Sequence, residues 1–183
     1  MLRIAAVLAI VSCFPFQAFA AEPRWHKFGV GGPGDKASLS IGQVAMTIET
    51  REVNGAHFRE DNLVLSVRIP GQKRSQELWF SSSYGSGEVA IFGDLLLLKY
   101  GIGRGTSVRV EHVKAMRLKE GLEELVDVQT SYYVLAPRAA NPDLITYRLK
   151  VAATNGFTVL TFALPRKVPG FPSEKTVSLR NDG

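Results

Sequence analysis

Residues 87–119 read GEVAIFGDLLLLKYGIGRGTSVRVEHVKAMRLK, and this stretch decides the fold. The leucines Leu95–Leu98 lie between the Gly93-Asp94 pair and the glycines of 101–105, so the apolar run has the length of a strand rather than of a helix. Because a strand that is apolar on both faces must be covered on both faces, we predict that Leu95–Leu98 lies at the centre of the core.

The glycines of 101–105 predict a hairpin turn, and the valine-rich residues that follow predict its return strand. Side chains alternate between the two faces of a strand. We expect one face to look inward, carrying Val108, Val110, His112, Lys114, Met116 and Leu118. The opposite face then carries Ser107, Arg109, Glu111, Val113, Ala115 and Arg117. His112 and Lys114 interrupt the inward face, so either the strand leaves the core there or a bulge re-aims it.

The N-terminal residues 1–20, MLRIAAVLAIVSCFPFQAFA, have the pattern of a secretory signal peptide. An early charge at Arg3 precedes an apolar middle, and small residues at Ala18 and Ala20 form the cleavage pattern. We therefore expect export to the periplasm or beyond, with a mature chain that begins near Ala21. A lipid anchor at Cys13, within the lipobox-like run Ile-Val-Ser-Cys, is the minor alternative.

Composition narrows the class of partner. The formal net charge of the full chain is +5, or +4 once Arg3 is removed with the leader, and the pI is near 9.5. This mild excess suits an anionic partner but is too weak to indicate nucleic acid. Cys13 is the single cysteine, so the mature chain would contain no disulfide, thiolate nucleophile or cysteine metal site. No later stretch has the length of a transmembrane helix.

Other segments repeat the strand pattern. Leu63–Ile69 alternates cleanly, Ile41–Thr50 and Ile145–Val151 read as further strands, and Asn155-Gly156 signals a tight hairpin. In the strand 75–81, Leu78 and Phe80 face away from Glu77 and Trp79. Leu122–Val128 fits a strand or a short helical turn. About ten such candidates without a convincing helix predict an all-β protein: an antiparallel sandwich or barrel, as a single domain over 21–183, with little or no helix.

The candidate ligand-binding residues come from two stretches of the chain. Tyr84 and Ser86 belong to the Ser/Gly-rich stretch 81–87, whose composition fits an exposed flexible loop. The others form what we expect to be a basic hairpin mouth with a histidine beside it: Lys99, Arg104, Arg109 and His112, in the company of Arg117. Tyrosine stacking and Lys/Arg pairing would suit an anionic or carbohydrate component of the cell envelope. A partly buried, backbone-bonded histidine is the simplest interpretation of His112, with a functional role as the alternative.

Two other function classes stay open. The residues Ser83-Tyr84-Gly85-Ser86-Gly87 resemble in composition, although not in order, the loop that small periplasmic lysozyme inhibitors present to their enzyme. That resemblance implies an inhibitor that binds a secreted protein. A hydrolase would have to draw on the following residues: His57, His112, Asp94 and Glu111. Since no motif places them together, we predict a non-catalytic domain with no cofactor and no metal site, and the sequence leaves the oligomeric state open.

Overall fold

The computed structural model describes residues 20–31, 34–51, 62–82, 85–103, 110–119, 121–134 and 143–181. In chain order the strands are β1 (His26–Gly29), β2 (Lys36–Ile41), β3 (Val44–Thr50), β4 (Asn62–Arg68), β5 (Gln76–Ser81), β6 (Ser86–Phe92), β7 (Leu95–Ile102), β8 (Val110–Leu118), β9 (Leu122–Gln129), β10 (Ser131–Val134), β11 (Asp143–Thr146), β12 (Arg148–Thr154), β13 (Phe157–Ala163) and β14 (Glu174–Arg180). The predicted all-β, antiparallel fold is therefore confirmed, and of the two predicted architectures, sandwich or barrel, the separate sheets match the sandwich.

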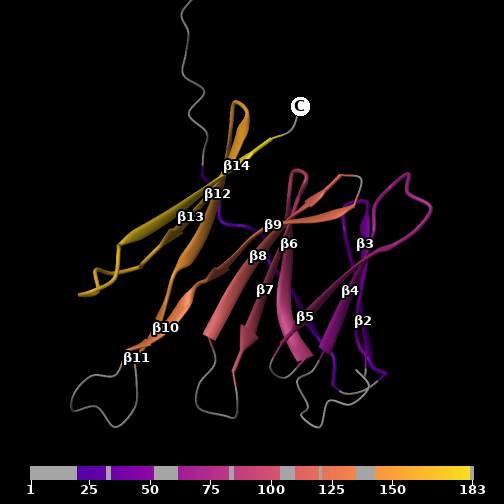
Figure 1. Ribbon diagram of the computed structural model, residues 1–183, viewed down its shortest axis with the longest axis horizontal. Helices are drawn as coiled ribbons and strands as arrows, with labels where there is room; N and C mark the ends of the chain where they lie inside the picture. Colours follow the sequence, from indigo (N-terminus) through magenta and orange to yellow (C-terminus); the bar gives the residue numbers. More distant parts are fainter. Residues whose placement is uncertain are drawn as a thin grey trace, which may run out of the picture.

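The strands form four antiparallel sheets, three of which stack as layers. The central sheet has the order β1-β6-β7-β8-β9, one outer sheet is β2-β3-β4-β5, and the other is β12-β13-β14. Figure 1 shows the β2–β5 sheet in purple on one side of the central strands and the β12–β14 sheet in gold on the other. The short pair β10-β11 completes the fold.

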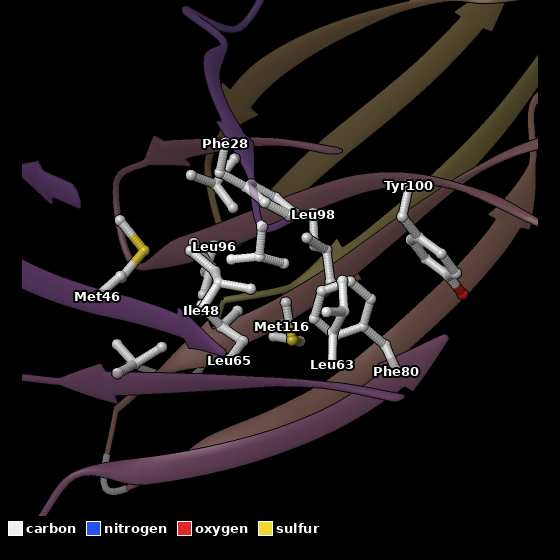
Figure 2. Close-up of a cluster of buried hydrophobic side chains, with 13 residues drawn as sticks. Phe28, Met46, Ile48, Leu63, Leu65, Phe80, Leu96, Leu98, Tyr100 and Met116 are labelled. Carbon is white, nitrogen blue, oxygen red and sulfur yellow. The ribbon is translucent and has the colours of Figure 1, made fainter. Parts of the chain in front are cut away.

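Two hydrophobic clusters occupy the two spaces between these layers. The first joins the central sheet to the β2–β5 sheet and includes Phe28, Met46, Ile48, Leu63, Leu65, Phe80, Leu96, Leu98, Tyr100 and Met116 (Figure 2). The second joins the central sheet to the β12–β14 sheet and includes Ala90, Leu95, Leu97, Val113, Ala115, Leu149, Val151, Leu160 and Phe162. Each cluster removes large apolar side chains from water, which is the main favourable contribution to folding.

The position of Leu95–Leu98 confirms the prediction made from the sequence. All four side chains are at most 2% exposed, with Leu96 and Leu98 in the first cluster and Leu95 and Leu97 in the second. Strand β7 is the middle strand of the middle layer, so both of its faces need apolar residues. An uninterrupted leucine run is the sequence that such a position requires.

The hairpin around β7 and β8 differs from the prediction in two ways. Gly101 does not begin the turn, because it is buried within β7 and pairs with Glu111 of β8. Strand β8 is also buried on both faces rather than one, since Val113 and Ala115, expected to look outward, belong to the second cluster. The third layer, which the alternation of a single strand cannot reveal, is the physical reason.

Elsewhere, two predicted strands are each divided. Ile41–Thr50 contains the turn between β2 and β3, at Gly42, and Ile145–Val151 is interrupted at Tyr147 between β11 and β12. Leu122–Val128, which also fitted a helical turn, lies in strand β9. The Asn155-Gly156 signal is confirmed, because these two residues form the turn between β12 and β13. The described part of the chain contains no helix with the length and apolarity needed to cross a membrane.

Candidate functional site

The predicted basic mouth is only partly within the described residues, which exclude Tyr84, Arg104 and Arg109. Lys99 is described, and its ammonium group is already paired. Its Nζ lies 2.5 Å from Glu88 Oε2 on the neighbouring strand and 5.2 Å from the centroid of the Trp25 ring. The charge of Lys99 is therefore offset by a carboxylate, and its ammonium group lies over the face of an aromatic ring.

Arg117 lies at the opposite end of the hairpin from Gly101, because it pairs with Leu95 at the start of β7. It is 6% exposed, and its guanidinium contacts Glu123 at 3.2 Å and Asp94 at 3.8 Å and donates to the carbonyl of Arg180 at 2.5 Å. Arg117 thus joins the β6–β7 turn, β9 and β14. It serves the packing of these elements and is not near Lys99.

The stretch 81–87 is not an exposed loop over its described part. Ser82 and Gly85 are buried, and Ser86 and Gly87 open strand β6. The Ser82 hydroxyl donates to the Ser86 carbonyl at 2.6 Å, and the Val30 amide donates to the Gly85 carbonyl at 2.9 Å. The small residues are needed here for close packing of β1 against β6, a reason that the composition alone does not reveal.

His112 belongs to a network of polar side chains on the β2–β5 side of the central sheet. Its Nδ1 lies 3.1 Å from Asp127 Oδ1, and the Tyr100 hydroxyl donates to Asp127 Oδ2 at 2.5 Å. Lys114 contacts Glu124 at 2.7 Å and Asp127 at 3.6 Å. Because an ionised carboxylate only accepts hydrogen bonds, Nδ1 of His112 carries the proton toward Asp127. Within the described residues, the hydrogen bond of His112 Nδ1 is thus to a side chain, whereas a bond to a backbone group was predicted.

A β-bulge explains why Asp127 meets these residues. The register between β8 and β9 shifts between Ala115 and Met116, so that β9 contains one extra residue at Leu125. Beyond the shift, Asp127 lies opposite Lys114, a place that Val126 would occupy in an uninterrupted register. The two alternatives predicted for β8 were departure from the core or a bulge at His112 and Lys114. The bulge instead lies in the neighbouring strand β9, and it places Asp127 opposite these polar residues.

The hydrogen bonds and ion pairs of this network hold its side chains in fixed positions. Burial first, and then the hydrogen bond to Asp127, raise the pKa of the Tyr100 hydroxyl, which therefore remains a donor. Of the acids considered for a hydrolase, Asp94 lies near Arg117, and Glu111 is paired with Gly101 and alternates to the face opposite His112. His57 lies outside the described residues. The three candidates that lie within the described residues, Asp94, Glu111 and His112, are therefore not brought together.

The outer face of the β2–β5 sheet carries a different set of side chains. Trp79 is 50% exposed and lies in the cross-strand row Lys36, Glu49, Val64, Trp79. The adjacent row across the same strands consists of Ser38, Thr47, Ser66 and Glu77. We call these two rows, together with Arg51, the Trp79 face. They set a flat indole beside a line of hydroxyl and carboxylate groups.

A chain of ion pairs fixes the charged side chains of the Trp79 face. Arg51 forms a bidentate pair with Glu77, at 2.9 and 2.7 Å, and also donates to Glu49 at 2.5 Å, while Lys36 contacts Glu49 at 2.6 Å. The Arg51 guanidinium lies 5.8 Å from the centroid of the Trp79 ring. Each cation is matched by a carboxylate, so the face is polar but close to neutral.

These contacts keep the carboxylates ionised. Hydrogen bonds from Lys36 and then from Arg51 lower the pKa of Glu49, and the hydrogen bond from Arg51 lowers the pKa of Glu77. The same pairs raise the pKa of Arg51, with the bond to Glu77 as the largest cause. At neutral pH the face therefore presents charge-paired acceptors and donors in fixed positions.

The Trp79 face was not among the predicted site residues. The alternation of 75–81 places Trp79 beside Glu77, away from Leu78 and Phe80, as the structure confirms. Exposure of a tryptophan on that outward face was the signal that could have identified the site. Arg51 has no such signal, because its contact with Glu77 depends on the pairing of β3, β4 and β5. Comparisons with protein-family models, curated proteins and solved structures find no match for this chain.

Proposed function

We propose that this chain is an exported, non-catalytic binding domain that holds a saccharide chain of the cell envelope on the Trp79 face. The observation that carries the proposal is the half-exposed Trp79 ring beside a row of hydroxyl and carboxylate groups, on the face of the β2–β5 sheet that lies away from the first cluster. Exposed tryptophan combines a large apolar surface with low conformational entropy, and it is frequently the residue on which binding energy concentrates.

The chemistry of the Trp79 face suits a sugar better than a free polyanion. The C–H face of a pyranose ring can stack on the indole, while its hydroxyl groups exchange hydrogen bonds with Ser66, Thr47 and Glu77. The cations Arg51 and Lys36 are already paired with Glu77 and Glu49. A polyanion would have to replace those carboxylates, whereas a sugar can bond to them as they stand.

Replacing Trp79 with alanine should lower the affinity for the saccharide at least about thirtyfold, a change of about 2 kcal/mol typical of a tryptophan anchor. Affinity electrophoresis in gels containing solubilised peptidoglycan glycan, a neutral β-glucan or polygalacturonate would measure the effect. Phe157→Ala is the matched control, because Phe157 is 45% exposed on the β13 strand of a different sheet. Equal retardation of the wild type and Trp79→Ala in every gel would contradict the proposal.

Salt separates a stacked sugar from an anionic polymer. Exposed charge pairs weaken as the Debye length falls, so a polyanion held by Lys and Arg should be released by about 0.5 M salt. Binding through Trp79 should change less than about threefold over that range, because apolar stacking and neutral hydrogen bonds are weakly screened. A Trp25→Phe variant would leave Trp79 as the single tryptophan of the chain, so its fluorescence would report the same binding directly.

We further infer that the leader is removed after Ala20. In the folded chain the Ala21 amide donates to the Val151 carbonyl at 2.9 Å, and the Val151 amide donates to the Ala21 carbonyl at 2.8 Å. Both contacts survive cleavage between Ala20 and Ala21, since the new amino group can still donate. The bridge holds the scissile nitrogen against β12, which favours cleavage before the chain folds.

Intact-mass analysis of the exported protein should therefore give a chain that begins at Ala21. A chain that begins at Cys13 and carries acyl groups would instead establish the lipoprotein alternative. An Ala20→Tyr change, which replaces a small residue of the cleavage pattern, should cause the precursor to accumulate. Ala21→Ser is the control, because it keeps a small residue and the backbone bridge to Val151.

A further inference from the structure

We propose that two copies of this chain pair through the edge of β14, antiparallel and about a two-fold axis at Val177. Strand β14 is the last strand of the β12-β13-β14 sheet, and no described strand pairs with its outer side (Figure 1), where the Arg180 carbonyl accepts a hydrogen bond from the Arg117 guanidinium. The other edge of the same sheet, strand β12, is partly covered, because Ala21 forms a backbone bridge to Val151. An unpaired edge offers a row of donors and acceptors to another strand.

The register within the sheet shows which backbone groups of β14 point outward. Asn181 donates to the Gly156 carbonyl at 2.8 Å, and Leu164 donates to the Ser173 carbonyl at 2.9 Å, so odd-numbered residues of β14 face β13. In an antiparallel ladder the direction alternates at each residue. The amide and carbonyl groups of Glu174, Thr176, Ser178 and Arg180 therefore point away from β13, and all four residues are exposed.

The sequence of this edge is complementary to itself. In β14, which reads EKTVSLR, an antiparallel pairing centred on Val177 sets Glu174 opposite Arg180 of the second copy. The same pairing sets Thr176 opposite Ser178, and these two residues can exchange both backbone hydrogen bonds. Opposite charges and hydroxyl pairs directly across two strands both stabilise a sheet. The partly buried Val177 side chains of the two copies meet at the axis.

The one lysine of the strand does not protect this edge. Charged residues, lysine above all, commonly block unwanted pairing at sheet edges. The Lys175 ammonium instead turns to the inner side, 4.5 Å from the Tyr132 ring centroid and 4.7 Å from that of Tyr147, and it donates to the Tyr132 hydroxyl at 2.8 Å. The charges left on the outer side are Glu174 and Arg180, which complement each other in the pairing proposed.

Sedimentation velocity over a range of concentrations tests the pairing, and the wild type should pass from monomer to dimer. Arg180→Glu sets two acids against each other at each end of the interface, and Glu174→Arg sets two bases. Each variant should raise the dimer dissociation constant at least about tenfold. A one-to-one mixture of the two variants should form a heterodimer as stable as the wild-type dimer, because every charge then meets its opposite.

Two further variants separate the interface from general effects of charge and folding. Lys150→Glu makes a charge change of the same size on exposed β12, at the other edge of the sheet, and should leave the dimer unchanged. Ser178→Pro removes an amide that points away from β13, so it should preserve the fold and abolish dimerisation. A wild type that stays monomeric up to about 1 mM, or variants Arg180→Glu and Ser178→Pro that dimerise like it, would overturn the proposal.

Discussion

Replacing Leu96 or Leu97 with alanine should each lower the free energy of unfolding by about 3 kcal/mol, the cost of a buried leucine plus the cavity left behind. Both side chains are 0% exposed, but they enter different clusters. Leu96 packs toward the β2–β5 sheet and Leu97 toward the β12–β14 sheet. Two adjacent residues of one strand with equally large effects are expected only where both faces of that strand are covered.

Urea unfolding followed by circular dichroism would measure both losses. Leu144→Ala is the control, because Leu144 is 52% exposed and its truncation should change the free energy of unfolding by less than about 0.5 kcal/mol. If one of the two core variants lost less than about 1 kcal/mol, the face on which that leucine lies would not be packed as described, and the three-layer arrangement would be wrong.

The success with Leu95–Leu98 shows what a sequence can reveal about this fold. The apolar character of both faces of β7 can be read directly from consecutive residues in the sequence. The alternation that places Trp79 on the face opposite Leu78 and Phe80 can be read in the same way. Such local patterns decide which side of a strand is buried. They do not reveal how many layers stack, which is why Val113 and Ala115 were expected to look outward.

The contacts of His112 could not be predicted from the alternation of residues within one strand. Alternation places His112 and Lys114 on one face, but their partner Asp127 comes from another strand whose register is shifted by one residue at Leu125. A shift of one residue exchanges the two faces of β9, so no pattern within β8 can identify the acid. The bidentate pair of Arg51 with Glu77 depends on the pairing of β3, β4 and β5 in the same way.

The stretch 81–87 shows a different reason for error, since glycine and serine suit exposed loops and tight packing equally well. Gly85 and Gly93 have the same backbone φ of 60°, which disfavours side chains, but their surroundings differ. A Cβ added at Gly93 would meet nothing within 4 Å, whereas one added at Gly85 would lie 2.1 Å from the Val30 carbonyl oxygen. Of these two glycines, Gly85 is the one at which a neighbouring segment, Val30 after β1, leaves no room for a side chain.

Gly93→Ala should therefore lower the free energy of unfolding by about 1 kcal/mol, the cost of the left-handed backbone alone. Gly85→Ala should lower it by about 3 kcal/mol or more, because overpacking adds to that cost and separates β1 from β6 at the hydrogen bond between Val30 and Gly85. Urea denaturation of both variants under the same conditions measures the difference, and the shared φ removes the backbone contribution from the comparison. Equal losses would mean that Val30 yields easily, and that 81–87 is as adaptable as its composition first indicated.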